Sequence, residues 1–261
     1  MILIDHDKCV GCGLCVSDCI GYNLKLQDGK AVARRECFLC GHCVAICPAG
    51  AVSIPEYDME DVESYDKDLF HIDPEKLLRT IKYRRSIRDY HSTKLTEEEL
   101  KLLLQAGRYT ATAKNVQDCT FVFVQDALEE LKELVWGDIE RREASDAEVE
   151  AMKPYYSFNR RRKADPKDDY LFRNAPAVLF VTSEWPLNAG LAAQNVETMA
   201  AAMGLGVMYN GYLCRIADSN IELKTWLGIE EKTIRACLLL GHPNRHYVRT
   251  APRAQANVIW K

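Results

Sequence analysis

The chain has 261 residues, 48% of them hydrophobic and 28% charged, a composition that argues against a largely disordered protein. Its formal net charge of −4 argues against bulk binding to nucleic acid, which requires a basic surface. No apolar run approaches the length that spans a bilayer, and the best candidate, Ala175–Thr182, suits a buried strand. We therefore expect neither a nucleic-acid nor a membrane partner.

Cysteine spacing is the most informative feature near the N-terminus. Eight of the eleven cysteines form two copies of one pattern, with three cysteines at three-residue steps and a fourth four residues later. This pattern is typical of bacterial proteins with two [4Fe–4S] clusters, in which the fourth cysteine of each run binds the other cluster. One predicted cluster has the ligands Cys9, Cys12, Cys15 and Cys47, and the other has Cys37, Cys40, Cys43 and Cys19. Residues 1–60 resemble the two-cluster bacterial ferredoxins.

Two other uses of these cysteines fit the sequence less well. Structural zinc sites usually show paired Cys-x2-Cys knuckles with four ligands per ion, and not three cysteines at three-residue steps. Disulfide bonds need an oxidising compartment, and Met1–Asp7 has neither the basic region nor the apolar core of a signal peptide. The remaining cysteines lie in apolar contexts that indicate buried thiols: Cys119, Cys214 and Cys237. We expect a reducing, cytoplasmic environment.

The segments around the cysteines predict a small domain. Short apolar runs at Met1–Ile4 and Ala51–Ile54 are expected to pair as a small sheet. Between the two cysteine runs, Leu24–Gln27 and Lys30–Ala33 predict a hairpin with an Asp-Gly turn. Residues 1–60 therefore form the predicted ferredoxin-like domain.

An acidic segment follows this domain. Residues 61–74 lack helical periodicity, and we expect them to form an extended linker between two domains. A helix then begins after Asp73, which caps its first turn, with Pro74 in the first helical position, and the helix ends near Tyr83. Residues 75–261 form the predicted second domain.

The second domain alternates helices and strands. Thr96 and Glu99 have the spacing of a capping box, and the helix that they begin extends to Gly107. Further helices are expected at 127–149, 187–203 and near 220–227, and strands at 120–125, 175–182 and 235–240. This order of elements predicts a sheet that is covered by helices, of the α/β or α+β class.

A basic cluster, Arg84-Arg85-Ser86-Ile87-Arg88, follows the helix that ends near Tyr83. Arginine binds phosphate through two parallel hydrogen bonds and remains charged, so the cluster suits the phosphate or ring of flavin mononucleotide (FMN). A simpler role also fits, in which the arginines interact with the carbonyl dipole at the helix end.

Three further segments, taken in order with the arginine cluster, resemble the FMN-dependent nitroreductase family over residues 75–261. They are 112–117, then Gly190, Gln194, Asn195, Gly204 and Gly206, and finally 240–243 with Arg249 and Arg253. Gly204 and Gly206 do not form a dinucleotide-binding fingerprint, because a third glycine is missing and the pair follows a helix where the fingerprint follows a strand. The resemblance implies an α+β fold with a nitroreductase-like mixed sheet and flanking helices. It also implies a symmetric homodimer with FMN at its interface.

The resemblance implies roles for the basic residues. Arg84, Arg85 and Ser86 would contact the FMN phosphate and ribityl chain, and Arg249 would return to the phosphate. Arg88 would lie near the pyrimidine edge of the flavin ring, where its positive charge favours the reduced form.

Contacts to the ring come from two other segments in the family. The side chains of Asn115 and Gln117 would hydrogen-bond to the ring, and backbone groups would line it at Tyr209, Asn210 and Gly211. Three positions depart from the family pattern. Proline is frequent where this chain has Ala111 and Asp118, and a second basic residue is common where it has Val248.

Residues 137–169 form a long excursion in the predicted second domain. It contains Tyr155, Tyr156 and Phe158, followed by the basic run 160–163. The aromatic side chains could cover the flavin and select substrates, and the basic run could attract an anionic substrate or an acidic partner. Equally, the segment could be a solvated helical insert with a charged face.

Together the two predicted domains describe an oxidoreductase. Clusters carry one electron at a time and FMN stores two, so the chain would pass electrons from two [4Fe–4S] clusters to FMN. The acceptor would be an electron-poor small molecule, namely a nitroaromatic, a quinone or an activated alkene, and the donor would be ferredoxin or NAD(P)H. No catalytic side chain is assigned. The alternative is an electron-transfer module that delivers electrons to a protein partner.

Overall fold

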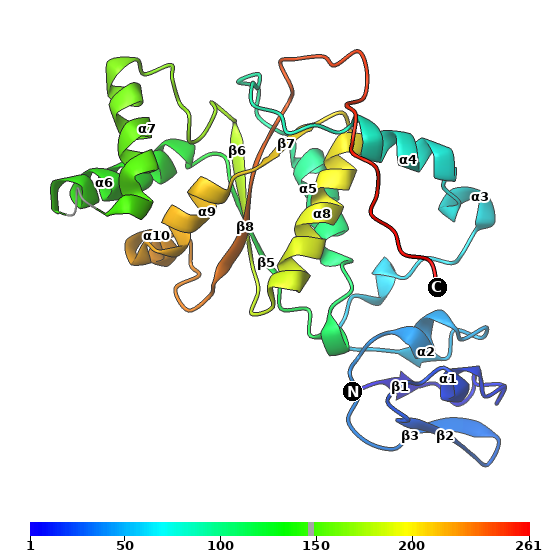
Figure 1. Ribbon diagram of the computed structural model, residues 1–261. Coiled ribbons are helices and arrows are strands. Elements are labelled where there is room, and N and C mark those ends of the chain that lie inside the picture. The colour runs from blue at the N-terminus through cyan, green and yellow to red at the C-terminus, as the bar shows by residue number, and fades with distance from the viewer. Residues whose placement is uncertain (146–148) are drawn as a thin grey trace. The chain divides into compact units, whose positions relative to one another are not determined.

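A computed structural model describes residues 1–145 and 149–261 (Figure 1). The chain divides into two compact units. The first consists of residues 1–72 and 112–116, and the second consists of residues 73–111 and 117–261. Among the described residues, no helix is both long enough and apolar enough to cross a bilayer.

Two small antiparallel sheets frame the first unit. Strand β1 (Leu3–Ile4) pairs with β4 (Val52–Ser53), and β2 (Leu24–Gln27) pairs with β3 (Lys30–Ala33), as the sequence predicted. The turn between β2 and β3 has φ angles of 51° at Asp28 and 74° at the following glycine. Both angles lie in the left-handed region that Asp-Gly hairpin turns use.

Two one-turn helices carry the cysteine motifs. Helix α1 (Leu14–Ser17) and helix α2 (His42–Ala45) each contain the third cysteine of their motif. Each helix follows a glycine with positive φ, 75° at Gly13 and 77° at Gly41. Glycine adopts this conformation without the steric cost that a side chain imposes, so the chain can turn sharply between the second and third cysteines. The duplicated sequence therefore folds as a duplicated structure.

The acidic segment 61–74, which was predicted as an extended linker, contains a short helix, α3 (Lys67–Phe70). A 3-10 turn at Met59–Asp61 ends at the first residue of this segment. The Oδ1 atom of Asp66 accepts hydrogen bonds from the backbone N–H groups of Asp68 and Leu69. The extended prediction was wrong at α3, because an aspartate cap can start a helix without any apolar periodicity.

The first two helices of the second unit begin where the sequence predicted. Helix α4 (Pro74–Tyr83) is capped by Asp73, whose carboxylate accepts two N–H groups of the first turn. Helix α5 (Glu97–Arg108) has a complete capping box, in which Thr96 Oγ1 accepts from the Glu99 N–H and the Glu99 carboxylate accepts from the Thr96 N–H. These caps satisfy donors that have no partner inside the helix.

A four-stranded sheet forms the centre of the second unit. Its strand order is β5 (Thr120–Val124), β6 (Ala177–Thr182), β8 (Ile234–Gly241) and β7 (Gly206–Tyr209). Neighbouring strands run antiparallel. A parallel bridge between Ser86 and Val207 extends the edge at β7 and makes the sheet mixed. This arrangement, with helices around it, confirms the predicted α+β class.

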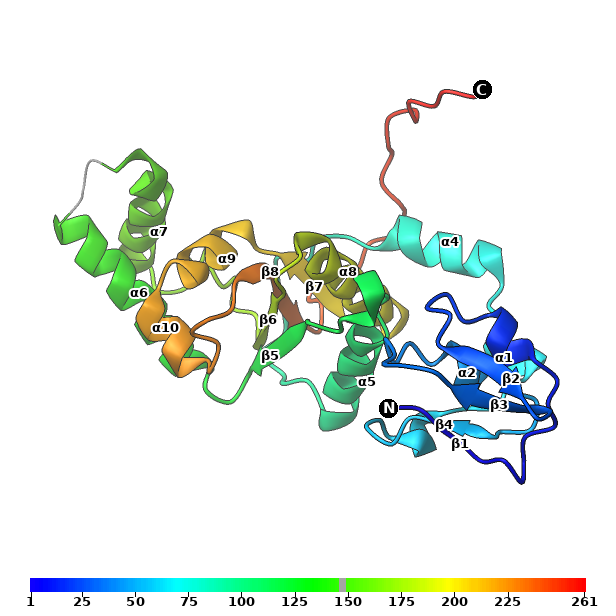
Figure 2. The ribbon, with the colours of Figure 1, turned by 90° about the horizontal axis from the view of Figure 1, so that it is seen from below.

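Helices cover both faces of the sheet (Figures 1 and 2). Helices α5 and α8 (Pro186–Ala202) pack on one face. The other face is covered by α6 (Leu128–Ser145), α7 (Lys153–Ala164), α9 (Gly211–Asp218) and α10 (Ile221–Trp226). Successive side chains of β6 point to opposite faces, so that Leu179 packs in the first layer and Phe180 in the second. All six residues of β6 are buried, as expected for a strand between two helix layers.

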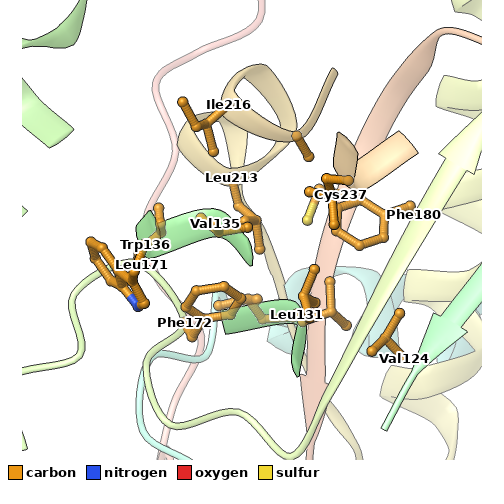
Figure 3. Packing of buried hydrophobic residues seen from close by; sticks show 14 of the residues in the cluster. Val124, Leu131, Val135, Trp136, Leu171, Phe172, Phe180, Leu213, Ile216 and Cys237 are labelled. Carbon is orange, nitrogen blue, oxygen red and sulfur yellow. The ribbon is translucent and has the colours of Figure 1, made fainter. Parts of the chain in front are cut away.

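Figure 3 shows the core of the second layer. Phe180 from β6 and Cys237 from β8 lie beside Leu213 of α9 and Leu131 of α6, and each is at most 2% exposed. Helix α9 itself was not predicted from the sequence. It begins after Asn210, whose Oδ1 atom accepts the backbone N–H of Leu213.

Candidate redox cofactor sites

The first unit contains two cavities that are lined by cysteines. The first cavity brings together Cys9, Cys12, Cys15 and Cys47. The second brings together Cys19, Cys37, Cys40 and Cys43. Each cavity thus takes three cysteines from one motif and the fourth from the other motif, which is the crossed arrangement that the spacing predicts.

Each cavity has the number of thiolates that a [4Fe–4S] cluster requires. A cubane has an iron at each of four corners, and each iron takes one cysteine ligand. The four cysteines of each cavity therefore fit one cubane.

Backbone N–H groups point at a sulfur atom in both cavities. In the first cavity, the N–H groups of Ala31 and Ala51 donate to Cys9 Sγ at 3.5 Å and to Cys47 Sγ at 3.3 Å. In the second, the Asn23 N–H donates to Cys19 Sγ at 3.3 Å and the Leu39 N–H donates to Cys37 Sγ at 3.4 Å. Such donors stabilise thiolate charge and help to set the potential of a cluster.

The surroundings of the thiols shift their pKa values in different directions, and burial raises the pKa of Cys15 in the first cavity. The N–H groups of Ala31 and Gly11, and then the charge of Lys30, lower the pKa of Cys9. Burial, followed by the neighbouring thiols Cys37 and Cys40, raises the pKa of Cys43 to about 11. A thiolate is therefore easier to form at Cys9 than at Cys43.

In the second unit, the basic cluster lies along strand β7. The backbone N–H of Ile87 donates to the carbonyl of Val207 at 3.0 Å, next to the Ser86 bridge. Gly206 makes this approach possible, because a Cβ atom there would lie 2.8 Å from Ile87 Cγ1. Two predicted flavin-binding segments, 84–88 and 209–211, therefore meet at the same edge of the sheet. Arg85 and Arg88 belong to the first of them, and Arg88 is exposed.

Arg84 makes an ion pair that the sequence did not predict. Its Nη1 atom lies 2.6 Å from Oε1 of Glu197, a residue of α8 that is 3% exposed. The Nε atom of Arg84 is also buried and has no hydrogen-bond acceptor among the described residues. A sequence signal for Glu197 exists, because Ala193 and Ala200 lie on the same face of the helix and are buried. A carboxylate on a buried helix face requires a charged or hydrogen-bonding partner.

The residues at the end of β7 differ in burial and in the hydrogen bonds that they make. Burial raises the pKa of Tyr209, and the nearby carboxylate of Glu197 raises it further. The side chain of Asn210 is hydrogen-bonded within the fold, since its Nδ2 atom donates to the Leu171 carbonyl at 2.6 Å and its Oδ1 atom caps α9. Its backbone N–H donates to the Cys237 carbonyl, and its carbonyl accepts from Cys214. Gly211, by contrast, is exposed.

The other predicted flavin contacts come from other segments of the chain. Asn115 belongs to the first unit, where its Nδ2 atom donates to the carbonyls of Phe38 and Leu39 at 3.2 and 3.0 Å. Gln117 belongs to the second unit and has a positive φ of 48°. Arg249 lies in the exposed segment after β8, which has no helix or strand.

Asp118, which stands where the family often has proline, organises a loop. Its carboxylate accepts hydrogen bonds from Ser183 Oγ at 2.6 Å, from the Glu184 N–H at 2.9 Å and from Asn188 Nδ2 at 2.8 Å. Burial raises the pKa of Asp118, but these three hydrogen bonds outweigh it, so that the net shift is downward. The aspartate thus ties the start of β5 to the loop before α8.

The aromatic residues of the 137–169 excursion are part of the core. Tyr155, Tyr156 and Phe158 lie on α7 and are at most 8% exposed. The Tyr155 hydroxyl donates to the Tyr212 carbonyl at 2.9 Å, and the Phe158 ring stacks on Tyr170 with centroids 4.5 Å apart. These contacts favour the structural interpretation of the excursion over that of a flavin cover.

The basic run of α7 is paired with acidic side chains. Arg160 contacts Glu143 at 3.3 Å and Arg161 contacts Asp168 at 2.7 Å. Arg162 and Lys163 share the carboxylate of Glu140, each at 3.2 Å. Since each cation has a carboxylate neighbour, the run leaves little uncompensated charge to attract an anionic substrate.

Comparison with known proteins decides the family of the larger unit. Residues 81–242 match the model of the Nitroreductase family, and residues 1–64 match that of a 4Fe-4S dicluster domain. The chain belongs to the nitroreductase family. This nitroreductase therefore carries an N-terminal ferredoxin-type iron–sulfur domain, and both resemblances seen in the sequence are confirmed.

Relatives of this nitroreductase align with one or the other part. The NADPH-flavin oxidoreductase of Vibrio harveyi is 28% identical over 187 residues, covering 70% of this chain and 71% of the relative. A ferredoxin of Methanocaldococcus jannaschii is 35% identical over 57 residues, covering 20% of this chain and 92% of the ferredoxin. Among solved structures, a nitroreductase with bound FMN from Bacteroides fragilis has a TM-score of 0.58 at 21% identity, covering 71% and 99% of the two chains. That likeness confirms the fold.

Proposed function

We propose that this nitroreductase uses two [4Fe–4S] clusters and FMN to reduce an electron-poor organic acceptor such as a nitroaromatic, a quinone or an activated alkene. The proposal depends on one observation, which is the pair of cavities in a chain whose larger unit belongs to the nitroreductase family. Each cavity is lined by three cysteines of one motif and one cysteine of the other. The solved relative with bound FMN and the flavin oxidoreductase relative support FMN as the cofactor of the larger unit. When bound, clusters exchange single electrons and FMN exchanges one or two.

The residues at the β7 edge suit the phosphate of FMN. Arg84 is held by the buried carboxylate of Glu197, and its buried Nε atom is a donor that has no acceptor among the described residues. Ser86, one of the residues bridged to β7, adds a hydroxyl group two residues away. A guanidinium whose orientation is fixed binds a phosphate with less loss of side-chain entropy than a free one. Arg84 and Ser86 are therefore the proposed phosphate ligands.

Arg88 is the proposed neighbour of the flavin ring. Its Nη1 atom donates to the Ser86 carbonyl at 3.3 Å, and the side chain is exposed. A permanent positive charge beside the ring stabilises the added negative charge of reduction. Replacing Arg88 with Met should therefore lower the potential of the bound flavin, which an anaerobic spectroscopic titration measures. An unchanged potential would remove this role.

Exposed apolar residues support a homodimer. Helix α4 has no buried residue, and its apolar side chains Leu77, Leu78 and Ile81 are 38%, 54% and 48% exposed. On α8, Leu187 and Leu191 are 71% and 43% exposed. Exposed apolar surface of this kind is typical of a subunit interface, and most homodimers are two-fold symmetric. Light scattering of the purified protein is expected to give the mass of a dimer, and a monomer at micromolar concentration would contradict this.

The main test is the cofactor content of protein purified without oxygen. We expect about eight irons and one FMN per chain, from two cubanes and one flavin site. Turnover of a nitroaromatic or quinone should follow, with NAD(P)H or reduced ferredoxin as the donor. Protein with a full complement of iron but no affinity for FMN would overturn the enzymatic proposal and favour an electron-transfer module.

A pair of variants makes this test specific. Arg84→Met should weaken FMN binding while leaving the iron content unchanged, because the change lies at the β7 edge. Arg79→Met is the matched control, since Arg79 is exposed and pairs with Glu75 one turn away in α4. Equal FMN affinity in the two variants would remove Arg84 from the phosphate site.

A further inference from the structure

The two cysteine cavities differ in their charged neighbours. Lys30, the first residue of β3, contacts the backbone of Cys9, which lines the cavity of Cys9, Cys12, Cys15 and Cys47. Its ammonium group donates to the carbonyl of Cys9 at 2.5 Å and to that of His6 at 2.8 Å. Both acceptors are neutral, so neither contact cancels the charge of Lys30. The residue is only partly exposed, which limits screening of this charge by water.

Backbone geometry places Lys30 at this cavity. Gly11, between Cys9 and Cys12, has a φ of 71°, and a Cβ atom there would lie 2.0 Å from the carbonyl oxygen of Gly29. The tip of the β2–β3 hairpin therefore packs directly against the loop that carries the first two cysteines. Since Lys30 follows that tip, its side chain is anchored beside Cys9.

The other cavity has charges of both signs that are exposed, as Asp5 and Lys8 are beside Cys9, where their carboxylate and ammonium groups lie 3.6 Å apart. Its charged neighbours Asp18, His42 and Arg35 do not include a partly buried cation like Lys30. The carboxylate of Asp18, next to Cys19, lies 3.0 Å from Nδ1 of His42. The guanidinium of Arg35 donates to the Gly21 carbonyl at 2.6 Å. Asp18 and Arg35 are both exposed and of opposite sign, so water and mutual compensation weaken their effect on the cavity.

We propose that Lys30 gives the cluster on Cys9, Cys12, Cys15 and Cys47 the higher reduction potential of the two. The inference depends on the proposed clusters. Reduction adds one negative charge to a cubane, and a nearby uncompensated cation stabilises that charge. In the exchange between clusters, one is oxidised by one electron and the other is reduced by one, with no bond made and no proton moved. The first electron to enter the unit therefore resides on the cluster beside Lys30.

The test is a redox titration of variants that differ in charge at one position. Lys30→Gln and Lys30→Met remove the charge, and Lys30→Arg keeps it. Lys25→Gln is the matched control, because it removes a lysine from an exposed position on the same hairpin. Protein purified without oxygen is titrated with dithionite and followed by electron paramagnetic resonance. The two signals are assigned with Cys12→Ser and Cys40→Ser, which alter equivalent exposed ligands of the two cavities.

We expect the charge-removing variants to shift the equilibrium for one electron by about tenfold toward the cluster on Cys19, Cys37, Cys40 and Cys43. For a one-electron couple, this is about 59 mV between the two clusters. Lys30→Arg and Lys25→Gln should leave the wild-type distribution unchanged.

Two outcomes would overturn the proposal. One is an unchanged distribution in Lys30→Gln or Lys30→Met that retains the wild-type iron content. The other is loss of the first cluster from both of these variants but not from Lys30→Arg, which would show that Lys30 acts by holding the Cys9 loop. Iron-free wild-type protein would instead contradict the proposed function. The titration follows the clusters alone, so its result does not depend on FMN binding.

Discussion

The two units of this nitroreductase form their interiors in different ways. Three of the nine residues in the buried cluster of the first unit are cysteines that line the proposed cluster cavities: Cys9, Cys15 and Cys43. In the second unit, apolar side chains fill both faces of a sheet, and β6 is buried along its whole length. A unit as small as the first rarely buries enough apolar surface to be stable, so metal ligation has to contribute to its stability.

The two units also differ in whether the residues that would bind the cofactor belong to the core. In the first unit, the residues that would bind the cofactor are themselves part of the core. In the second, the proposed phosphate ligands lie at the edge of the sheet, outside the two helix layers. A change at a cysteine should therefore alter folding and electron transfer together. A change at Arg84 should weaken cofactor binding and also destabilise the second unit, because it leaves the buried carboxylate of Glu197 without its partner, but it should spare the cysteine sites.

Removal of iron should have the largest effect. Chelation under reducing conditions is expected to abolish the cooperative unfolding transition of the first unit, because the thiolate–iron bonds are lost. Amide hydrogen exchange in β2 and β3 should accelerate by on the order of 100-fold, while β6 and β8 remain protected. Unchanged protection of β2 and β3 after complete iron removal would show that apolar packing alone maintains this unit.

Truncation of a side chain in the sheet core should destabilise the second unit and leave the first unit unchanged. Phe180→Ala leaves a cavity beneath α6 and α9 and should reduce the free energy of unfolding of the second unit by about 3–5 kcal/mol. Calorimetry would measure the transition, and the iron content should remain that of wild type. Leu102→Ala is the control, because Leu102 is 49% exposed on α5 of the same unit. Equal destabilisation by both changes would contradict the assignment of the core.

Asp118 offers a smaller, pH-dependent effect. Asp118→Asn should cost about 2 kcal/mol, since it weakens three hydrogen bonds to a charged acceptor. Because folding lowers the pKa of Asp118, its ionised form stabilises the fold at pH values above about 4, the usual pKa of aspartate. The difference in stability between wild type and variant should therefore shrink as the pH falls through the folded pKa.

Denaturant unfolding at several pH values would measure this difference. Asp126→Asn is the matched control, because Asp126 pairs with Lys94 at an exposed position. The control should change stability by less than about 0.5 kcal/mol. A difference between wild type and Asp118→Asn that persists unchanged at low pH would show that the carboxylate charge is not the stabilising feature.

The smallest effect is expected in the 137–169 excursion. Arg161 is paired with Asp168, so Arg161→Gln should alter stability by only about 0–1 kcal/mol. It should also leave the ratio of kcat/KM for an anionic and a neutral acceptor within about twofold of wild type, a change of less than about 0.5 kcal/mol. A selective loss of the anionic substrate would restore the role in substrate attraction that the ion pairs argue against.

Where the sequence was decisive, a local rule determined the structure. The cysteine spacing predicted the two crossed cavities, and Asp28-Gly29 predicted the hairpin turn with its positive φ angles. The caps at Asp73 and Thr96 predicted where α4 and α5 begin. In each case, the residues that carry the signal also make the hydrogen bonds or line the site.

Features that depend on distant partners were missed. The sequence can indicate that Glu197 lies on a buried helix face, but not that its partner is Arg84, 113 residues away. Helix α9 was missed because Asn210-Gly211 is also a strong turn signal, and its role as a cap depends on the Leu213 N–H. The aromatic residues of α7 looked available for a ligand, yet they are buried by contacts with Tyr170 and Tyr212. The ion pairs of the basic run 160–163 could not be predicted either, because they depend on acidic side chains that the fold brings to it.

The first unit is built from two separate stretches of chain, 1–72 and 112–116. Asn115 supplies hydrogen bonds to the turn between Cys37 and Cys40 from the second stretch. A fragment that stops at residue 72 therefore lacks part of its own structure. Asn115 also lies within residues 81–242, which match the Nitroreductase family, so parts of the chain that belong to two different families contribute to one compact unit.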